Sequence, residues 1–369
     1  MAKIMVYGSG HAGCMYAAHL GRNGHDVRLF DVEQFSSNLI QVQRHGGFNL
    51  IGYGNGFAPI PLATTNIKQA IDGVEVIFVV VPSFAHKIAA QVMAPYLTEN
   101  HIVVLNPGNC LGVIEFKRAL EACGNHQSVK LAETASSIFA CRRKGEADIW
   151  VKGIKNVMPI ACWPAKEIET IGPKLKSLFD CYEPEPNIVY TSYNINNTVV
   201  HPITMLLNTG RIENTKGNFC FYWDGITESV GKCMEALDQE RVAISEALGF
   251  KQNRMLDLMH RFYDVYGGYE GKDTLHKFFD HGAVNGGPGS VCPSHMGTRY
   301  LTEDVPYGIV PWVQTAKLFG VPVPHMEAVV TLASTINNTD YYHEGRTLES
   351  LGLADMDREH FVRFIIEGY

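Results

Sequence analysis

The sequence predicts two domains: an α/β domain with a doubly wound parallel sheet over residues 1–187, and an all-α domain over residues 188–369. A strand, a glycine-rich turn, a helix and a second strand follow one another within residues 3–31. After residue 187 the spacing of apolar residues changes to the period of helices. Hydrophobic residues make up 46% of the 369 residues, which is enough for two cores.

Composition argues against several classes of protein. The formal net charge is −7 and the sequence shows no basic patch, so we expect no nucleic-acid partner. The longest apolar runs fall far short of the roughly 20 residues of a membrane helix, and the first strand begins too early to leave room for a signal peptide. Nine cysteines are scattered without a C-x-x-C pair. This pattern favours reduced thiols in a cytoplasmic protein, with no disulfide framework and no metal.

The stretch "KIMVYGSGHAG" predicts a nucleotide-binding turn between a strand and a helix. Gly8 permits the tight turn, Gly10 lets the backbone approach a pyrophosphate, and Gly13 lets the helix pack on the strand. The free amides at the start of the helix would receive the phosphate charge. The residues expected to contact the cofactor are Gly8, Ser9, Gly10, His11, Ala12 and Gly13. Three glycines alone are weak evidence, and the strand–turn–helix context is what supports this function.

Asp31 stands at the end of the second predicted strand, "DVRLF". A carboxylate at this position accepts hydrogen bonds from the adenosine ribose hydroxyls and repels a 2′-phosphate. Residues 32–43 contain no Lys or Arg that could bind such a phosphate; Arg44 is the first, and Arg28 lies inside the strand. We therefore expect the cofactor to be NAD, with NADP less favoured.

Further strands of near-continuous apolar character are predicted at residues 74–82, 101–108 and 129–136. Such strands suit a parallel sheet that is covered on both faces, and ligands bind beyond the carboxyl ends of its strands. Pro82 and Asn106 are therefore candidate cofactor contacts, and Thr134 is a candidate substrate contact. The alternative is that Pro82 and the "NPG" segment only form turns.

The remaining elements complete the two domains. Alternation over residues 147–164 predicts a hairpin that extends the sheet, followed by a helix near 165–180 and the polar segment "CYEPEPN". Amphipathic helices are predicted at 228–250, 253–267, 308–337 (a pair) and 357–369. The glycine-rich segment 276–293 is long enough to be a functional loop or lid.

The segment "NTVVHPITMLLNTGR" places a histidine and a proline inside an apolar helix. The predicted apolar face consists of Val199, Val200, Ile203, Leu206 and Leu207. Pro202 is expected to kink or start the helix. A dehydrogenase needs an acid–base group that changes its charge near neutral pH, and histidine is the natural choice. His201 is therefore a candidate, aimed into an interdomain cleft and oriented by Glu303 or Asp304. The alternative is a core histidine and a surface acid pair.

Seven motifs, in order along nearly the whole chain, resemble the octopine/nopaline dehydrogenase family, the opine dehydrogenases. They are "GSGHAG", "VVVPSFAH", "LNPGN", "AETASSIFACR", "HPITMLLN", "TRYLTEDVPYGIVP" and "EGRTLESLGL". The fifth and sixth motifs are much more specific than the glycine loop. The resemblance implies an oxidoreductase acting on CH-NH donors. It would condense an amino acid reductively with an α-keto acid, using NADH or NADPH, and would also run the reverse oxidation.

The resemblance also implies roles for individual residues. His201 matches the family's catalytic histidine and Asp304 the acid that partners it. Arg299 matches an active-site position whose guanidinium could hold the keto-acid carboxylate through two hydrogen bonds; the alternative is a structural ion pair. Asn208 is either a substrate-binding or a structural amide.

The implied partners are small molecules, an amino acid and an α-keto acid, and a homo-oligomer is allowed. Two other functions stay open at this point. One is a 2-hydroxy-acid or glycerol-phosphate type of dehydrogenase. Enzymes of the latter type use a lysine base, and residues 194–208 contain no lysine. The other is a non-catalytic NAD sensor.

Overall fold

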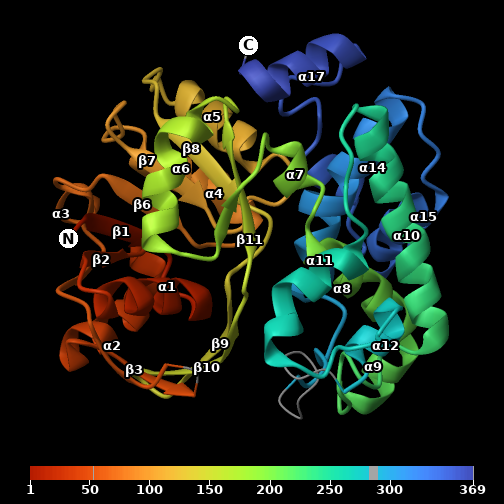
Figure 1. Ribbon diagram of the computed structural model, residues 1–369, viewed down its shortest axis with the longest axis horizontal. Coiled ribbons are helices and arrows are strands. Elements are labelled where there is room, and N and C mark those ends of the chain that lie inside the picture. The colour runs from red at the N-terminus through yellow and green to blue at the C-terminus, as the bar shows by residue number, and fades with distance from the viewer. Residues whose placement is uncertain (53, 282–289, 369) are drawn as a thin grey trace. The chain divides into compact units, whose positions relative to one another are not determined.

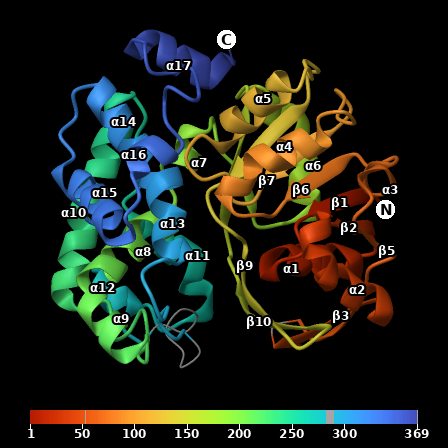
Figure 2. The ribbon, with the colours of Figure 1, turned by 180° about the vertical axis from the view of Figure 1, so that it is seen from behind.

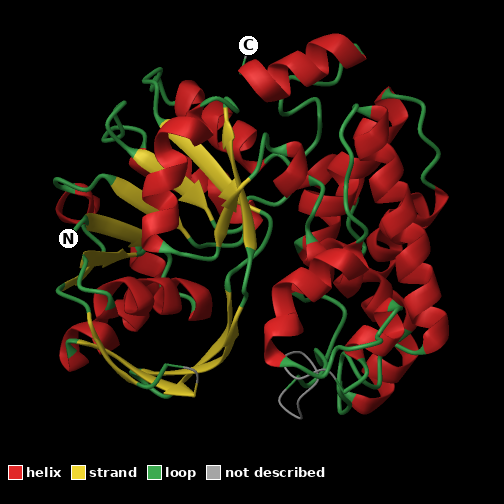
Figure 3. Cartoon of the chain, viewed as in Figure 1, coloured by secondary structure: helices red, strands yellow, loops and turns green. Residues whose placement is uncertain are grey.

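The computed structural model describes residues 1–52, 54–281 and 290–368. The chain forms two units, Met1–Ile188 together with Ile366–Gly368, and Val189–Ile365. In the described residues, every named strand lies in the first unit and the second unit is built from helices (Figure 3). This division lies one residue from the predicted boundary. The short C-terminal piece of the first unit was not predicted.

The first unit is built on a sheet with the strand order β12-β11-β8-β7-β6-β1-β2-β5. Its strands are β1 (Lys3–Tyr7), β2 (Asp26–Phe30), β5 (Leu62–Thr64), β6 (Val76–Val79), β7 (Ile102–Leu105), β8 (Lys130–Thr134), β11 (Met158–Trp163) and β12 (Tyr182–Pro184). From β1 the chain moves outward to β2 in one direction and through β6, β7 and β8 in the other, all in parallel. This is the predicted doubly wound arrangement, with its switch point between β1 and β6.

Helices cover both faces of this sheet. They are α1 (His11–Arg22), α2 (Ser36–His45), α3 (Ile67–Ile71), α4 (His86–Met93), α5 (Gly112–Ala122) and α6 (Glu167–Leu178), with the short 3-10 turns η1 (Glu33–Phe35) and η2 (Ser83–Ala85). Comparison of Figures 1 and 2 shows α4 and α5 on one face and α6 on the other. Right-handed crossovers place α1 on the face opposite α4 and α5. There, Tyr16 of α1 packs against Phe179, the residue that follows α6.

A second, smaller sheet in the first unit was not predicted. Its strand order is β4-β3-β10-β9, and its strands are β3 (Gly47–Gly52), β4 (Gly56–Pro59), β9 (Phe139–Lys144) and β10 (Asp148–Ile154). The predicted hairpin over residues 147–164 is therefore wrong. β10 pairs with β9 and β3, whereas β11 joins the larger sheet antiparallel to β8. β10 alternates between buried and half-buried residues, while β11 is buried throughout. Alternation identified strands here, but it does not specify their partners.

The second unit consists of helices. They are α7 (Val189–Ser192), α8 (Asn196–Leu207), α9 (Thr209–Thr215), α10 (Glu228–Ala247), α11 (Met255–Tyr263), α12 (Leu275–Phe279), α13 (Arg299–Thr302), α14 (Val310–Leu318), α15 (Pro324–Asn337), α16 (Tyr341–Glu344) and α17 (Arg358–Glu367), with a 3-10 turn η3 (Asp264–Tyr266) and a π-helical turn η4 (Val305–Ile309). The predicted amphipathic helices correspond to α10, α11, the pair α14 and α15, and α17. Part of the predicted lid, residues 282–289, lies outside the described residues.

Candidate active site

The turn between β1 and α1 has the backbone geometry of a phosphate site. Gly8 adopts a φ of 115°, a conformation that favours glycine, and a Cβ at Gly13 would lie 1.9 Å from the carbonyl oxygen of Gly8. By contrast, a Cβ at Gly10 would meet no described atom within 4 Å, so the space in front of Gly10 is open. The first hydrogen bond of the helix runs from Cys14 N to Gly10 O, and the first helical turn holds no acidic residue. The amides before Cys14 therefore form a helix start that favours an anion.

Asp31 is joined directly to this turn. The backbone N–H and the hydroxyl of Ser9 both donate to Oδ2 of Asp31, each at 2.6 Å, and Val32 N donates to Oδ1 at 2.9 Å. The carboxylate is consequently held in place, and Asp31 is only 6% exposed. Ser9 was predicted to contact the cofactor. Its amide and hydroxyl support Asp31 instead of pointing into the open space before Gly10. His11 is exposed, and its Nδ1 lies 3.0 Å from Arg143 N of β9.

The other candidates of the first unit differ in accessibility. Pro82 is half-buried just after β6. Asn106 and Thr134 are buried. The amide oxygen of Asn106 accepts hydrogen bonds from the hydroxyls of Tyr182 at 2.9 Å and Tyr16 at 3.1 Å. The hydroxyl of Thr134 donates to a backbone carbonyl at 2.9 Å. Both polar side chains are thus used in a hydrogen-bond network inside the unit.

Lys155 is a buried titratable group that the sequence did not single out. Its Nζ donates to the hydroxyl of Ser136 at 2.7 Å. Burial lowers the pKa of Lys155 from its ordinary 10.5 to about 7, because the low-dielectric interior disfavours the charged form. The amine therefore changes its charge within the physiological range.

In the second unit, α8 carries His201 and continues through Pro202. The proline therefore neither starts nor ends this helix. Val199 and Val200 of the predicted apolar face are buried, but Leu207 is 52% exposed. Leu207 is thus wrongly assigned to the buried face, because the helix ends at that residue.

His201 and Asp304 form a buried pair. Nδ1 of His201 and Oδ2 of Asp304 are 2.8 Å apart, and each residue is 6% exposed. Because an ionised carboxylate can only accept, the proton on Nδ1 points at Asp304 and Nε2 remains for proton exchange. Tyr300 stacks on the imidazole at 3.8 Å between ring centroids with an interplanar angle of 15°. The hydroxyl of Tyr222 lies 3.3 Å from Nε2.

The π-helical turn η4 fixes the position of Asp304, which directly precedes it. A Cβ at Gly308 of this turn would lie 2.3 Å from Oγ1 of Thr198, one turn before His201 in α8. The backbone N–H of Arg346 also donates to Pro306 O at 2.9 Å. The "EGRTLESLGL" motif, which contains Arg346, is therefore tied directly to η4.

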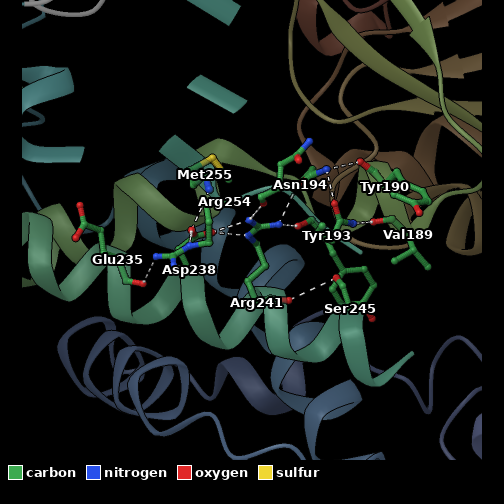
Figure 4. Close-up of polar contacts among 12 residues, drawn as sticks. Val189, Tyr190, Tyr193, Asn194, Glu235, Asp238, Arg241, Ser245, Arg254 and Met255 are labelled. Atoms are coloured by element: carbon green, nitrogen blue, oxygen red, sulfur yellow. Dashed lines mark hydrogen bonds and ion pairs between the residues drawn. The ribbon is translucent and has the colours of Figure 1, made fainter. Parts of the chain in front are cut away.

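A buried charge network secures the segment before α8 (Figure 4). Arg241 of α10 is fully buried and pairs with Asp238 at 2.7 Å. One guanidinium nitrogen donates to Tyr193 O at 2.6 Å and to Oδ1 of Asn194 at 2.8 Å. Because these hydrogen bonds satisfy a buried cation, they also tie the backbone just before α8 to α10.

The two predicted substrate residues of this unit differ in their hydrogen bonds and exposure. Nε of Arg299 lies 2.8 Å from Oε2 of Glu303, yet the side chain of Arg299 is 67% exposed. The amide group of Asn208 donates to the carbonyls of Thr204 at 2.8 Å and Gly225 at 2.9 Å. Asn208 therefore acts as a structural link, whereas Arg299 combines an ion pair with an accessible guanidinium.

Sequence reasoning missed several residues around His201. Tyr300 lies within the "TRY" motif but was not selected, and Gly308 lies in the same motif without a signal of its own. Tyr222 occupies a turn between α9 and α10, where no periodicity marks a side chain. Arg241 and Asp238 read as ordinary charges of an amphipathic helix. Only the packing of the helices reveals their roles.

Two features are absent from the described part of the chain. Its helices include none with the length and apolar character needed to cross a bilayer. The same residues form no group of three or more His, Cys, Asp or Glu side chains arranged to hold a metal ion.

Comparisons with known proteins match both units. Residues 184–337 match the family model of the NAD/NADP octopine/nopaline dehydrogenase alpha-helical domain, and residues 3–108 match that of the NAD-dependent glycerol-3-phosphate dehydrogenase N-terminus. An opine dehydrogenase of Arthrobacter sp. (strain 1C) is 34% identical over 355 residues, which is 95% of each chain.

Two solved structures share the fold. Octopine dehydrogenase in complex with NADH and agmatine aligns with a TM-score of 0.78 at 18% identity, over 100% of this chain and 98% of that one. Yersinopine dehydrogenase with bound NADP⁺ aligns with a TM-score of 0.70 at 14% identity, over 100% and 98%. The predicted fold class and the resemblance are both confirmed: the chain belongs to the octopine/nopaline dehydrogenase family, the opine dehydrogenases, which are NAD- or NADP-dependent oxidoreductases.

Proposed function

We propose that this chain catalyses the NADH-dependent reductive condensation of an amino acid with an α-keto acid, and the reverse oxidation. The observation that carries the proposal is the buried contact of 2.8 Å between His201 Nδ1 and Asp304 Oδ2. It supplies an oriented acid–base group inside the unit that matches the family's helical domain. The relative from Arthrobacter, which is named an opine dehydrogenase, supports the same activity.

The first unit fits a dinucleotide. The open space before Gly10 and the helix start after it suit a pyrophosphate, and Gly8 and Gly13 allow the turn that presents them. Asp31, held by Ser9, suits the adenosine ribose hydroxyls and disfavours a 2′-phosphate, so NAD is the preferred form. Pro82 is a further proposed contact at the end of β6. When bound, NADH supplies the hydride for the imine carbon of the condensed substrates.

The acid–base pair donates and accepts the protons of this condensation. Attack of the amine on the keto carbon gives a carbinolamine, and its hydroxyl must be protonated before the C–O bond breaks and water leaves. His201, protonated on both nitrogens, supplies that proton from Nε2 and becomes neutral. Asp304 stabilises the imidazolium and keeps the Nδ1 proton in place, so the ring presents Nε2 to the reaction. In the oxidative direction the same atoms take the proton from water.

Arg299 is the proposed carboxylate site for the keto acid. Its exposed side chain carries a fork that can form two parallel hydrogen bonds, and Glu303 orients it through Nε. We expect Arg299→Lys to raise the KM for the keto acid about tenfold while NADH affinity stays unchanged, because lysine cannot replace the fork. A parallel loss of thermal stability would instead indicate the structural ion pair. Substrate contacts by Thr134 and Asn208 stay predictions. The hydrogen bonds of both side chains to backbone carbonyls favour supporting roles instead.

One assay tests the function directly. NADH oxidation is followed with pyruvate or another α-keto acid, alone and with each amino acid of a panel, and the product is identified by its mass. The proposal expects oxidation only when an amino acid is present, with a secondary amine as product. Turnover without an amine would identify a 2-hydroxy-acid dehydrogenase. NADH binding without any turnover would identify a sensor.

A cytoplasmic location completes the proposal. All nine cysteines are free thiols, as expected in a reducing compartment. Cell fractionation tests this location, and size-exclusion chromatography with light scattering tests whether the chain forms a homo-oligomer.

A further inference from the structure

The imidazole of His201 is enclosed on most sides. Asp304 occupies Nδ1, Tyr300 covers one face, and Phe221 lies edge-on with ring centroids 5.9 Å apart. The atom that exchanges protons is Nε2, and the hydroxyl of Tyr222 lies 3.3 Å from it. The Tyr222 hydroxyl therefore lies next to the atom through which His201 would exchange a proton with a substrate.

The hydroxyl of Tyr222 has the chemistry of a relay. A phenol donates one hydrogen bond and accepts another at the same oxygen. With Nδ1 protonated toward Asp304, Nε2 of neutral His201 accepts a hydrogen bond from Tyr222. When the ring is protonated, Nε2 donates to the Tyr222 oxygen, and the Tyr222 proton is left for a substrate. Tyr222 is half-buried whereas His201 is buried, so the hydroxyl links the enclosed ring to more accessible space.

The surrounding turn keeps this hydroxyl in place. The backbone N–H of Phe221 donates to Ser290 O at 2.9 Å, and Cys220 N donates to the carboxylate of Asp224 at 2.7 Å. The ring of Tyr222 stacks on Phe279 of α12 with centroids 5.3 Å apart and an interplanar angle of 14°. Packing of this kind preorganises a proton-transfer group, because little reorientation is needed during the reaction.

We propose that Tyr222 is the outer member of a proton relay formed by Asp304, His201 and Tyr222. The inference rests on the proposed function and adds a residue to it. The proton that His201 supplies then reaches the substrate through Tyr222. As the C–O bond of the carbinolamine breaks, the Tyr222 hydroxyl gives its proton to the departing oxygen and takes one from Nε2 of protonated His201. Water leaves, the substrate becomes an iminium ion, and His201 becomes neutral. Tyr222 ends in its starting form and Asp304 stays ionised. The oxidative direction reverses each transfer.

The test variant is Tyr222→Phe, which keeps the ring and its stacking on Phe279 and removes only the hydroxyl. Turnover with amino acid and keto acid should fall about 10- to 100-fold. This loss is at or below the lower end of the usual contribution of a proton-transfer group, because water can partly replace the hydroxyl. NADH affinity and the melting temperature should stay at the wild-type values. Tyr342→Phe, which removes a hydroxyl elsewhere in the same unit, is the matched control and should keep full turnover.

A second measurement separates a relay from mere support of the ring. Single-turnover rates are measured in mixtures of H₂O and D₂O. Two protons moving together give a curved dependence on the deuterium fraction in the wild type, and one proton gives a straight line in Tyr222→Phe. Wild-type turnover in Tyr222→Phe, or the same curvature in both proteins, would overturn the relay. Failure of the proposed function has a different signature, since wild-type protein would then be inactive with every pair of amino acid and keto acid.

Discussion

The glycine turn of the first unit and the acid–base pair of the second are built in different ways. The turn is a contiguous segment, and the residues that shape it, Gly8 and Gly13, are five positions apart. A Cβ at Gly13 would clash with the backbone of Gly8, and a Cβ at Gly8 would lie 2.4 Å from the carbonyl oxygen of Val80. His201 and Asp304 are separated by 103 positions along the chain and meet only because α8 and η4 pack together. The turn therefore depends mainly on residues within one segment, whereas the pair depends on the contacts that align α8 with η4.

The largest effect is expected at the pair itself. His201→Ala should lower turnover by about 10²–10⁴, the usual contribution of a positioned proton-transfer group. Asp304→Asn should lose much of the same factor, because an amide cannot stabilise an imidazolium. Since both residues act as one unit, the double variant should be little worse than the worse single variant.

Turnover and NADH fluorescence titrations of the three variants check this expectation. NADH affinity should stay constant, because the glycine turn belongs to the other unit. Losses that multiply in the double variant would show that the two residues act independently.

The next largest effect tests how far the activity of the pair depends on the packing of η4 against α8. Gly308→Ala places a methyl group 2.3 Å from Oγ1 of buried Thr198, so η4 must move away from α8 and carry Asp304 with it. A misplacement of about 1 Å can cost roughly 10²-fold in rate. Thr198→Ala removes the clashing atoms, and Thr198 Oγ1 has no hydrogen-bond partner among the described residues.

We therefore expect turnover to fall in Gly308→Ala and to recover in Gly308→Ala/Thr198→Ala, measured beside Thr198→Ala alone. Recovery of turnover is the decisive outcome, because a general loss of stability would not be repaired by removing one more side chain. A double variant as slow as Gly308→Ala would refute this account of η4.

A smaller effect is expected in the first unit. Asp31→Ser combined with Val32→Arg should raise the ratio of kcat/KM for NADPH over NADH by about tenfold or more, because the repulsion of a 2′-phosphate is replaced by attraction. Steady-state rates with both cofactors measure the ratio. Glu33→Ser, an exposed acid nearby, is the control for loss of charge and should leave the ratio unchanged. Wild-type protein that prefers NADPH would contradict the assigned role of Asp31.

The smallest effect concerns stability. The pKa of Lys155 is about 7 in the folded chain and near its ordinary 10.5 in the unfolded chain. Between these values the unfolded state binds more protons, so stability rises with pH over this window. Below about pH 7 the full cost of burying the ammonium is present. Lys155→Met should consequently raise the melting temperature by a few degrees at pH 6, and the gain should shrink toward pH 9.

Melting curves from pH 6 to 9 test this prediction, with Lys144→Met as the control because Lys144 is exposed on the neighbouring strand β9. A gain for Lys155→Met that is independent of pH would mean that burial of the charge is not its cause.

The sequence by itself determined the fold class, the glycine turn, Asp31 and most helices, because each depends on residues that are close along the chain. The pairing of β10 with β3 and β9 was decided by tertiary structure, since an alternating strand can pair with any compatible edge. The same holds for the surroundings of His201. The family resemblance pointed to His201 and Asp304, but Tyr222, Gly308 and Arg241 carry no local signal, and their roles arise from contacts between helices distant in sequence.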